Sequence, residues 1–191
     1  MELRNEISSS GVLGIIDLLR NADISVWIDG GWGVDALVGN QTRSHKDLVI
    51  IVPTSDVPRL QELLKTKGFR LDRGKPPDSF VLSDQAGLEV DVHAIQFDAE
   101  GNGVYLMENG EKWTFPAEGF TGQGRIEGKS VPCLSPRAQV LCHASGYAPC
   151  EKDLLDMALL RERFGVVLPP QLLPTKAEGA ASPGAGTERA R

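Results

Sequence analysis

The feature that most constrains the fold is the run IDGGWGVDALVGNQTRSHKDLVIIV at residues 28–52. An apolar strand over residues 25–28 leads to two glycines, Gly30 and Gly31, and a short helix begins at once. Glycines at such a junction permit a close turn, and the free N–H groups of a helix start can bind an anion. A glycine pair alone is usually only a turn. Here, however, a β-rich run that begins with the carboxylate Asp47 follows at a short distance, which favours an anion site in an α/β fold.

The rest of the chain shows a mixed pattern of helices and strands. Apolar spacing and capping residues predict helices over residues 12–19, 30–38, 56–67, from Ser135–Pro136 onward and over 151–164, and strands over 47–52, 69–71, 79–82 and 88–97. The turn-like SDQAG joins the last two strands as a hairpin. Residues 98–134 are Gly-rich and β-like, with no convincing helix.

These elements predict an α/β (α+β) chain in three parts. Residues 1–134 form the core, residues 135–168 a small C-terminal helical part, and residues 169–191 a tail. The tail is dominated by Pro, Ala, Gly and charged residues, which predicts disorder.

Composition narrows the classes of function. A formal charge of −6 and a pI near 5.1 provide no broad basic surface for nucleic acid. The N-terminus lacks the positive start and apolar run of a signal peptide, and no apolar window is long enough to span a bilayer. We expect a cytoplasmic protein with no nucleic-acid or membrane partner.

Acidic residues lie on two of the predicted strands. Asp47 begins one strand, and position 49 shares its face because alternate residues point the same way. On the other strand, LEVDVHAI sets Glu89, Asp91 and His93 on one face. If the strands are neighbours, Asp47 and Asp91 can converge on one cation. From pattern alone, a solvated sheet face is the commoner meaning of such alternation.

The segment WIDGGWGVDALVGNQTRSHKDL resembles the signature of the small antibiotic nucleotidyltransferases, the lincosamide and aminoglycoside 2''-nucleotidyltransferases. Their pattern is Gly-Gly-Trp, an aspartate three residues on, a glycine, and then Arg-x-His-x-Asp-x-Asp. It is matched by Gly30, Gly31, Trp32, Asp35, Gly39, Arg43, His45 and Asp47. The segments VDVHAI and CHASGYAPCEKDLLDMALL continue the resemblance, which covers roughly residues 10–165.

The resemblance implies a nucleotidyltransferase-like mixed β-sheet with flanking helices. It implies transfer of a nucleoside monophosphate from a Mg²⁺-bound nucleoside triphosphate, ATP among the candidates, to a hydroxyl of a lincosamide or aminoglycoside antibiotic, and so antibiotic resistance. It also suggests a homodimer. The implied metal ligands are Asp47 and Asp91, with Asp91 also taking the hydroxyl proton, and the implied nucleotide-binding residues are Gly30, Gly31, Arg43 and His45. His45 could instead support the start of the strand, and Asp35 the loop around Arg43.

The chain departs from the pattern at Val49, where the second aspartate of Asp-x-Asp falls. Valine cannot ligate a cation, and loss of one charge-stabilising group commonly costs roughly 10²–10³ in rate. Two hypotheses follow: a nucleotidyltransferase with a rearranged metal site, or a non-catalytic relative that keeps the pocket.

Some other polar and aromatic residues carry weaker signals. The side chains of His93 and His143 have no ligand partner evident in the sequence, and Cys142 falls on an apolar helical face. We expect these three to be structural rather than catalytic.

Overall fold

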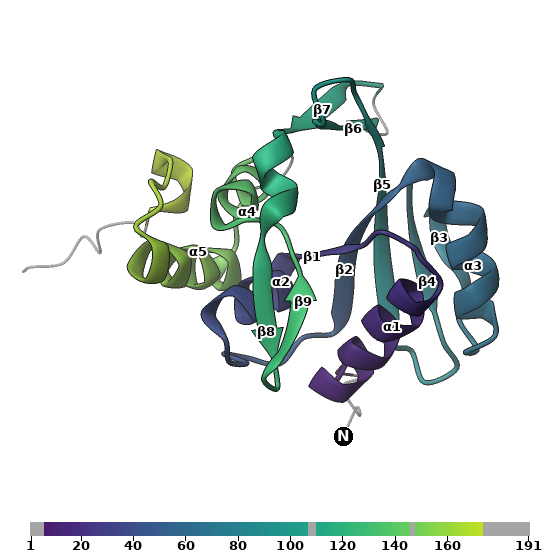
Figure 1. Cartoon of the computed structure of the whole chain (residues 1–191). Helices are drawn as coiled ribbons and strands as arrows, with labels where there is room; N and C mark the ends of the chain where they lie inside the picture. Colours follow the sequence, from purple (N-terminus) through teal and green to yellow (C-terminus); the bar gives the residue numbers. More distant parts are fainter. Residues whose placement is uncertain (1–5, 107–109, 146–147, 174–191) are drawn as a thin grey trace, which may run out of the picture.

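The computed structural model describes residues 6–106, 110–145 and 148–173. Its main sheet has the strand order β1-β2-β5-β4-β3, and β5 also pairs with the hairpin β6–β7 (Figure 1). The strands are β1 (Trp27–Asp29), β2 (Asp47–Pro53), β3 (Arg70–Lys75), β4 (Ser79–Ser83), β5 (Glu89–Phe97), β6 (Gly103–Leu106) and β7 (Lys112–Phe115), with a separate hairpin of β8 (Gln123–Ile126) and β9 (Lys129–Pro132). The helices are α1 (Ser9–Asn21), α2 (Gly30–Val38), α3 (Val57–Lys65), α4 (Pro136–His143) and α5 (Glu151–Phe164), with 3₁₀ turns η1 (Thr54–Asp56), η2 (Ala117–Thr121) and η3 (Pro170–Leu172).

The sheet is mixed, as the resemblance implied. β2 and β5 are parallel, whereas β1 pairs antiparallel with β2 and β4 pairs antiparallel with β5. A parallel pair needs a long crossover connection, and the chain between β2 and β5 supplies it through α3, β3 and β4. The predicted hairpin between β4 and β5 is confirmed, with Asp84 accepting hydrogen bonds inside its turn from the N–H groups of Ala86 and Leu88.

The two faces of the sheet differ, and this difference positions the site. One face is apolar and packs under α1 and α3, where it contributes Ile28, Leu48, Ile50, Val52, Phe80, Leu82, Val90 and Val92 to the main core. The alternating positions point to the opposite face and include Asp29, Val49, Asp91 and His93, which line a pocket. Strand periodicity of two therefore separates the core residues from the residues available for chemistry.

The C-terminal helices α4 and α5 pack against α2. A second apolar cluster joins Val34 of α2 with Val140 of α4, Met157 and Leu160 of α5, and the later residues Leu168 and Leu172. Leu172 is fully buried in η3. The packed C-terminal part thus extends beyond the expected boundary at residue 168, because an apolar side chain past it still completes this cluster. Residues 174–191 of the expected tail lie outside the described residues.

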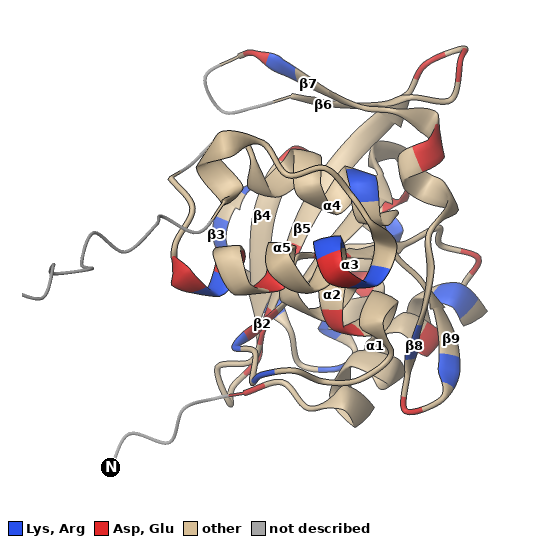
Figure 2. Cartoon of the chain, turned by 90° about the vertical axis from the view of Figure 1, so that its left-hand side faces the viewer, with Lys and Arg blue, Asp and Glu red and all other residues tan. Residues whose placement is uncertain are grey.

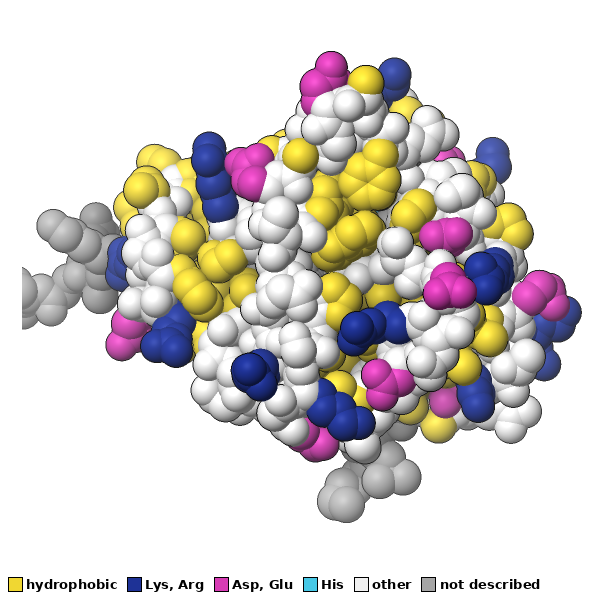
Figure 3. Space-filling view, in the orientation of Figure 1, with side chains coloured by type: hydrophobic (Ala, Val, Ile, Leu, Met, Phe, Trp, Pro, Cys, Tyr) yellow, Lys and Arg dark blue, Asp and Glu magenta, His cyan; other side chains and the backbone are white. Residues whose placement is uncertain are grey.

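The described part of residues 98–134 contains short strands and the 3₁₀ turn η2, as its β-like composition predicted. The hairpin β6–β7 stands above α4 at the top of Figures 1 and 2. Figure 2 also shows Lys and Arg interspersed with Asp and Glu over the visible elements. On the face drawn in Figure 3, apolar side chains gather beneath this hairpin and at the end of the molecule formed by α5.

Among the described residues, the helices are all too short or too polar to traverse a lipid bilayer.

Candidate active site

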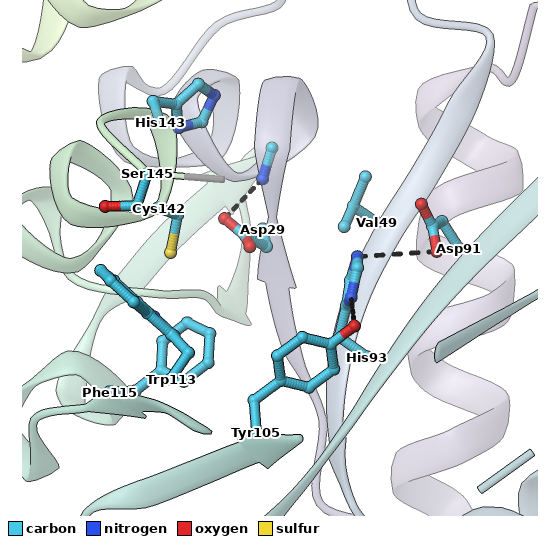
Figure 4. Close-up of a pocket in the computed structure, with 11 residues that line it drawn as sticks. Asp29, Val49, Asp91, His93, Tyr105, Trp113, Phe115, Cys142, His143 and Ser145 are labelled. Carbon is cyan, nitrogen blue, oxygen red and sulfur yellow. Dashed lines mark hydrogen bonds and ion pairs between the residues drawn. The ribbon is translucent and has the colours of Figure 1, made fainter. Parts of the chain in front are cut away.

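Two acidic residues of the site lie in a single row across the sheet. Asp29 of β1 lies opposite Val49 of β2, and Val49 lies opposite Asp91 of β5. Residues that lie opposite each other in neighbouring strands share a face of the sheet. The row therefore places one carboxylate on each side of Val49, and Figure 4 shows Val49 between Asp29 and Asp91.

Asp47 lies two residues before Val49 on the same face, beside the row rather than in it. Its register partner is Glu89, which is held by Arg73 through two hydrogen bonds of 2.9 and 2.7 Å. Asp47 and Asp91 are thus on neighbouring strands and on one face, offset by two residues. Glu89 is engaged elsewhere and does not take the place of the missing aspartate.

The electrostatics of Asp91 show that these carboxylates influence one another. Burial raises the pKa of Asp91, and the negative charges of Asp47 and Asp29 raise it further, while His93 and Arg73 partly oppose the shift. A nearby cation would relieve the same repulsion. Asp29 was missed in the sequence because it reads only as the end of a strand, and its place beside position 49 depends on β1 pairing with β2.

A pocket of about 440 Å³ opens over this row. Its floor is formed by Asp29, Gly30, Val49, Asp91 and His93, one wall by Tyr105, Trp113 and Phe115, and the other by Cys142, His143 and Ser145 (Figure 4). Gly30 has a φ of +60°, in the left-handed region that favours glycine, and its N–H donates to Asp29 Oδ1 at 2.7 Å. The glycine turn and the acidic row thus meet in one cavity.

The aromatic wall comes from the hairpin β6–β7. Tyr105 faces Trp113 in the register of the hairpin, and the ring of Tyr105 packs edge-on against His93 with centroids 5.5 Å apart. His93 also lies 3.6 Å from Asp91 (Nε2 to Oδ1) and 3.4 Å from Tyr105 (Nδ1 to the hydroxyl oxygen). A signal for this wall is present in the sequence, because a chain with only 6% aromatic residues places three of them close together in a Gly-rich segment.

The opposite wall comes from the end of α4 and the residues after it. Cys142 and His143 were expected to be structural, and they do pack, but both also line the pocket. Burial raises the pKa of the Cys142 thiol well above its ordinary value, so the sulfur remains protonated and is a poor nucleophile. The His143 ring is tied to α4 through Nδ1, which donates to the carbonyl of Gln139 at 2.8 Å. Both side chains therefore shape the cavity.

Of the other expected nucleotide-binding residues, Gly31 completes the turn, and Arg43 and His45 lie behind it. These three are not among the residues that line the pocket, and the buried His45 bonds to Asp35, which also accepts hydrogen bonds from Thr42 in the loop. Of the residues predicted for the site, Gly30 and Asp91 line the pocket and Asp47 shares its face. Arg43 donates to Asp156 of α5, a residue that no pattern in the sequence singles out.

The chain resembles proteins of known function over most of its length. It is 28% identical over 157 residues to a lincosamide resistance protein of Staphylococcus haemolyticus, covering 82% of this chain and 96% of that protein. Its structure matches the lincomycin-bound lincosamide antibiotic adenylyltransferase LnuA with a TM-score of 0.73 at 28% identity, covering 82% of this chain and 98% of that one. It matches ANT(2'')-Ia in complex with adenylyl-2''-tobramycin with a TM-score of 0.63 at 20% identity, covering 81% and 87% of the two chains.

The fold is therefore that of a nucleotidyltransferase, and the similar proteins of known function support this class for the chain. A sequence model of the aminoglycoside-2''-adenylyltransferase family matches residues 11–160. The chain belongs to that family, as the resemblance of its glycine turn and acidic strands indicated.

Proposed function

We propose that this protein transfers a nucleoside monophosphate from a Mg²⁺-bound nucleoside triphosphate to a hydroxyl group of a lincosamide antibiotic, releasing pyrophosphate. The observation that carries this proposal is one cavity with the glycine turn and Asp91 on its floor and an aromatic wall above them. Such a cavity can hold a triphosphate and a small acceptor at adjoining positions. Because related proteins are named adenylyltransferases, ATP is the first nucleotide to test.

The residues present are suited to hold Mg²⁺ at a site where the protein supplies few of the ligands. Mg²⁺ is commonly bound by one or two carboxylates, with waters and substrate phosphates completing its octahedron. Asp47 and Asp91 supply carboxylate ligands on one face, and the pKa of Asp91, raised mainly by burial and further by the charge of Asp47, marks a place where a cation would be stabilising. Among the described residues no three acidic, His or Cys side chains form a ready-made cage. Mg²⁺ would therefore arrive with the nucleotide, neutralising the triphosphate charge.

Asp91 is the proposed proton acceptor. Its carboxylate is on the pocket floor, on the other side of Val49 from Asp29. As the acceptor oxygen bonds to the α-phosphorus, its proton passes to Asp91 and the bond to pyrophosphate breaks. Transfer of this kind depends on positioning and charge neutralisation more than on covalent participation by the protein.

The lining of the pocket favours a lincosamide over an aminoglycoside. An aminoglycoside carries several ammonium groups, and each buried charge needs a paired carboxylate. Among the described residues that line the pocket, the carboxylates are Asp29 and Asp91, and the walls consist of aromatic rings, Cys142, His143 and Ser145. Aromatic faces suit an acceptor with an apolar body and few charges. The relative LnuA is described with bound lincomycin, in agreement with this choice.

Incubation with Mg²⁺, each nucleoside triphosphate, and either lincomycin or tobramycin tests the proposal. Mass spectrometry is expected to detect lincomycin carrying one added nucleoside monophosphate. Product should be lost when EDTA is added. It should also be lost in Asp91→Asn, a variant that keeps the shape of the side chain. Modification of tobramycin alone would contradict the choice of acceptor, and absence of any product would contradict the proposed transfer.

A second candidate function, nucleotide binding without transfer, rests on Val49. Its side chain lies against Gly30 on the pocket floor, so a methyl group occupies the region where the family pattern has a carboxylate. If this candidate is correct, calorimetry will detect a nucleoside triphosphate bound with Mg²⁺, while the incubation yields no modified antibiotic.

A further inference from the structure

Asp156 is a buried carboxylate on α5, far along the chain from the glycine turn. Its side chain is only 2% exposed, and a charge in that position needs a partner. Arg43 provides it through two hydrogen bonds, from Nη2 to Oδ2 at 2.6 Å and from Nε to Oδ1 at 3.2 Å. Although burial alone would lower it, the pKa of Arg43 is raised because Asp156 accepts these bonds and lies beside it. The pair joins α5 to the loop before β2.

The same guanidinium extends the link to α2. Arg43 Nη1 lies 3.0 Å from His45 Nδ1, and because a guanidinium has no acceptor, this nitrogen must accept. The ring proton of His45 is then on Nε2, which donates to Asp35 Oδ2 at 2.5 Å. Asp35 Oδ1 accepts from the Thr42 backbone N–H at 3.1 Å and from its hydroxyl at 2.5 Å. A continuous chain of hydrogen bonds thus runs from α5 to α2.

This chain packs directly on the glycine turn. A Cβ atom placed on Gly31 would lie 2.4 Å from His45 Nδ1 and 2.5 Å from Arg43 Nη2, closer than any real contact. Gly31 is therefore required because Arg43 and His45 lie against its backbone. Its neighbour Gly30 forms part of the pocket floor. The side of the turn away from the pocket is backed by a guanidinium that Asp156 holds in place.

We propose that Asp156 is a positioning residue for nucleotide binding: through Arg43 it fixes the Gly30–Gly31 turn in the conformation that receives the triphosphate. The inference rests on the proposed function in one respect, that the turn binds a nucleoside triphosphate. Without Asp156, the Arg43 guanidinium loses the carboxylate that accepts two of its hydrogen bonds. The guanidinium that packs behind the turn then becomes mobile. Nucleotide binding must then order the turn, which lowers affinity. Arg43 acts from behind the turn, whereas a direct phosphate ligand would act from the pocket.

Titration calorimetry with ATP and Mg²⁺ separates these roles. We expect Asp156→Asn and Arg43→Gln each to weaken ATP binding about tenfold, and the double variant to be no weaker than either single variant, because residues acting as one unit are not additive. Leu160→Ala is the matched control, since Leu160 is fully buried on the same helix and belongs to the apolar cluster. It should lower the melting temperature while leaving ATP affinity unchanged.

Hydrogen exchange of the free protein provides a readout independent of nucleotide. The backbone amides of residues 30–34 should exchange faster in Asp156→Asn than in the wild type, and should be unchanged in Leu160→Ala. If Asp156→Asn does not fold, Arg43→Lys tests the same link, because lysine keeps the charge and loses the bidentate fork.

Four results would overturn the inference. Tighter ATP binding by Asp156→Asn would show that a freed Arg43 contacts phosphate directly. Unchanged affinity in that variant, or an equal loss in Leu160→Ala, would make the pair merely structural. A wild type that binds no nucleoside triphosphate would overturn the proposed function together with the inference, whereas the first three results leave the proposed function intact.

Discussion

At the scale of single residues, Val49 decides how this site can work. It lies in register between Asp29 and Asp91, shares the face of Asp47, and has its side chain against Gly30. The sequence predicted the shared face from spacing alone, and the pocket lining confirms that Val49 faces the cavity. A single valine therefore lies among three carboxylates. Compared with the aspartate of the family pattern, it removes about one unit of negative charge from the place where the triphosphate is proposed to bind.

Val49→Asp is expected to raise Mg²⁺-dependent transfer by roughly 10²-fold, the scale associated with one restored charge-stabilising group. The variant should be slightly less stable without metal, because the new carboxylate lies beside Asp29 and Asp91. Product formation with lincomycin, followed by mass spectrometry over time, measures the change. Val49→Asn is the matched control, because asparagine has the shape of aspartate but carries no charge. Its rate of transfer should rise little above that of the wild type. A fast wild type that gains nothing from the aspartate would contradict the placement of Val49 at the metal.

At the scale of elements, local patterns predicted most of the scaffold. The helix α5 begins and ends at the predicted residues 151 and 164, and α4 begins after Ser135, whose side chain accepts from the Ala138 N–H. Caps and periodicity are local signals, so the sequence reveals them. Which residues meet in the pocket depends on strand pairing across long separations, and Asp29, Trp113 and His143 could not be brought together from spacing alone.

The hairpin β6–β7 should determine how the acceptor binds. Trp113 projects from this hairpin into the pocket, facing the acidic row (Figure 4). Trp113→Ala removes a large apolar face, and we expect the KM for lincomycin to rise about tenfold or more, with ATP affinity unchanged. Steady-state kinetics with each substrate varied in turn measure this split. Trp113→Phe, which retains an aromatic ring, should recover most of the loss, and an equal weakening of ATP binding would contradict an acceptor role for the wall.

The start of α5 should give the protein a defined acid sensitivity. Asp153 Oδ2 accepts from the Cys150 N–H at 2.8 Å, and although burial alone would raise it, this bond and its neighbours leave the pKa of Asp153 lowered. A lowered pKa stabilises the fold above the ordinary carboxyl value of about 3.9, and that contribution is lost as pH falls through the lowered value. We expect Asp153→Asn to cost about 1 kcal/mol at pH 7.

Urea unfolding at pH 7, 5 and 3 measures this contribution. The difference in unfolding free energy between wild type and Asp153→Asn should be retained at pH 5 and shrink at pH 3. Glu162→Gln, an exposed change on the same helix, should show no such dependence. A difference that stays constant across the three pH values would assign the effect of Asp153 to packing rather than to its charge.

At the scale of the whole molecule, the C-terminal helices and the sheet share their cores. Ala138 of α4 packs with Ile51 and Ile95 of the sheet, and Met157 of α5 packs with Val34 of α2. The division at residue 134 was predicted from a change of composition. It marks a change in the sequence, whereas the side chains on its two sides pack into shared apolar clusters. Composition marks where strands give way to helices, and it carries no information about whether the two parts can separate.

We therefore expect the described chain to unfold in a single cooperative transition. Differential scanning calorimetry should give a calorimetric enthalpy equal to the van't Hoff enthalpy, the test of a two-state process.

Leu172→Ala provides the sharper probe, because Leu172 is fully buried in the cluster between α2, α4 and α5 although it lies near the C-terminal end of the described residues. Removing a buried leucine side chain costs about 2–5 kcal/mol, and if the molecule is one unit, this cost must lower the melting temperature of the whole protein. In Leu172→Ala, the temperature at which the near-ultraviolet circular dichroism is lost and the temperature at which the sheet amides begin to exchange should fall by the same amount. Two resolved transitions, with only the earlier one moved by Leu172→Ala, would show instead that the C-terminal helices melt away from the sheet. In that case the glycine turn would lose its support from α5 before the core unfolds.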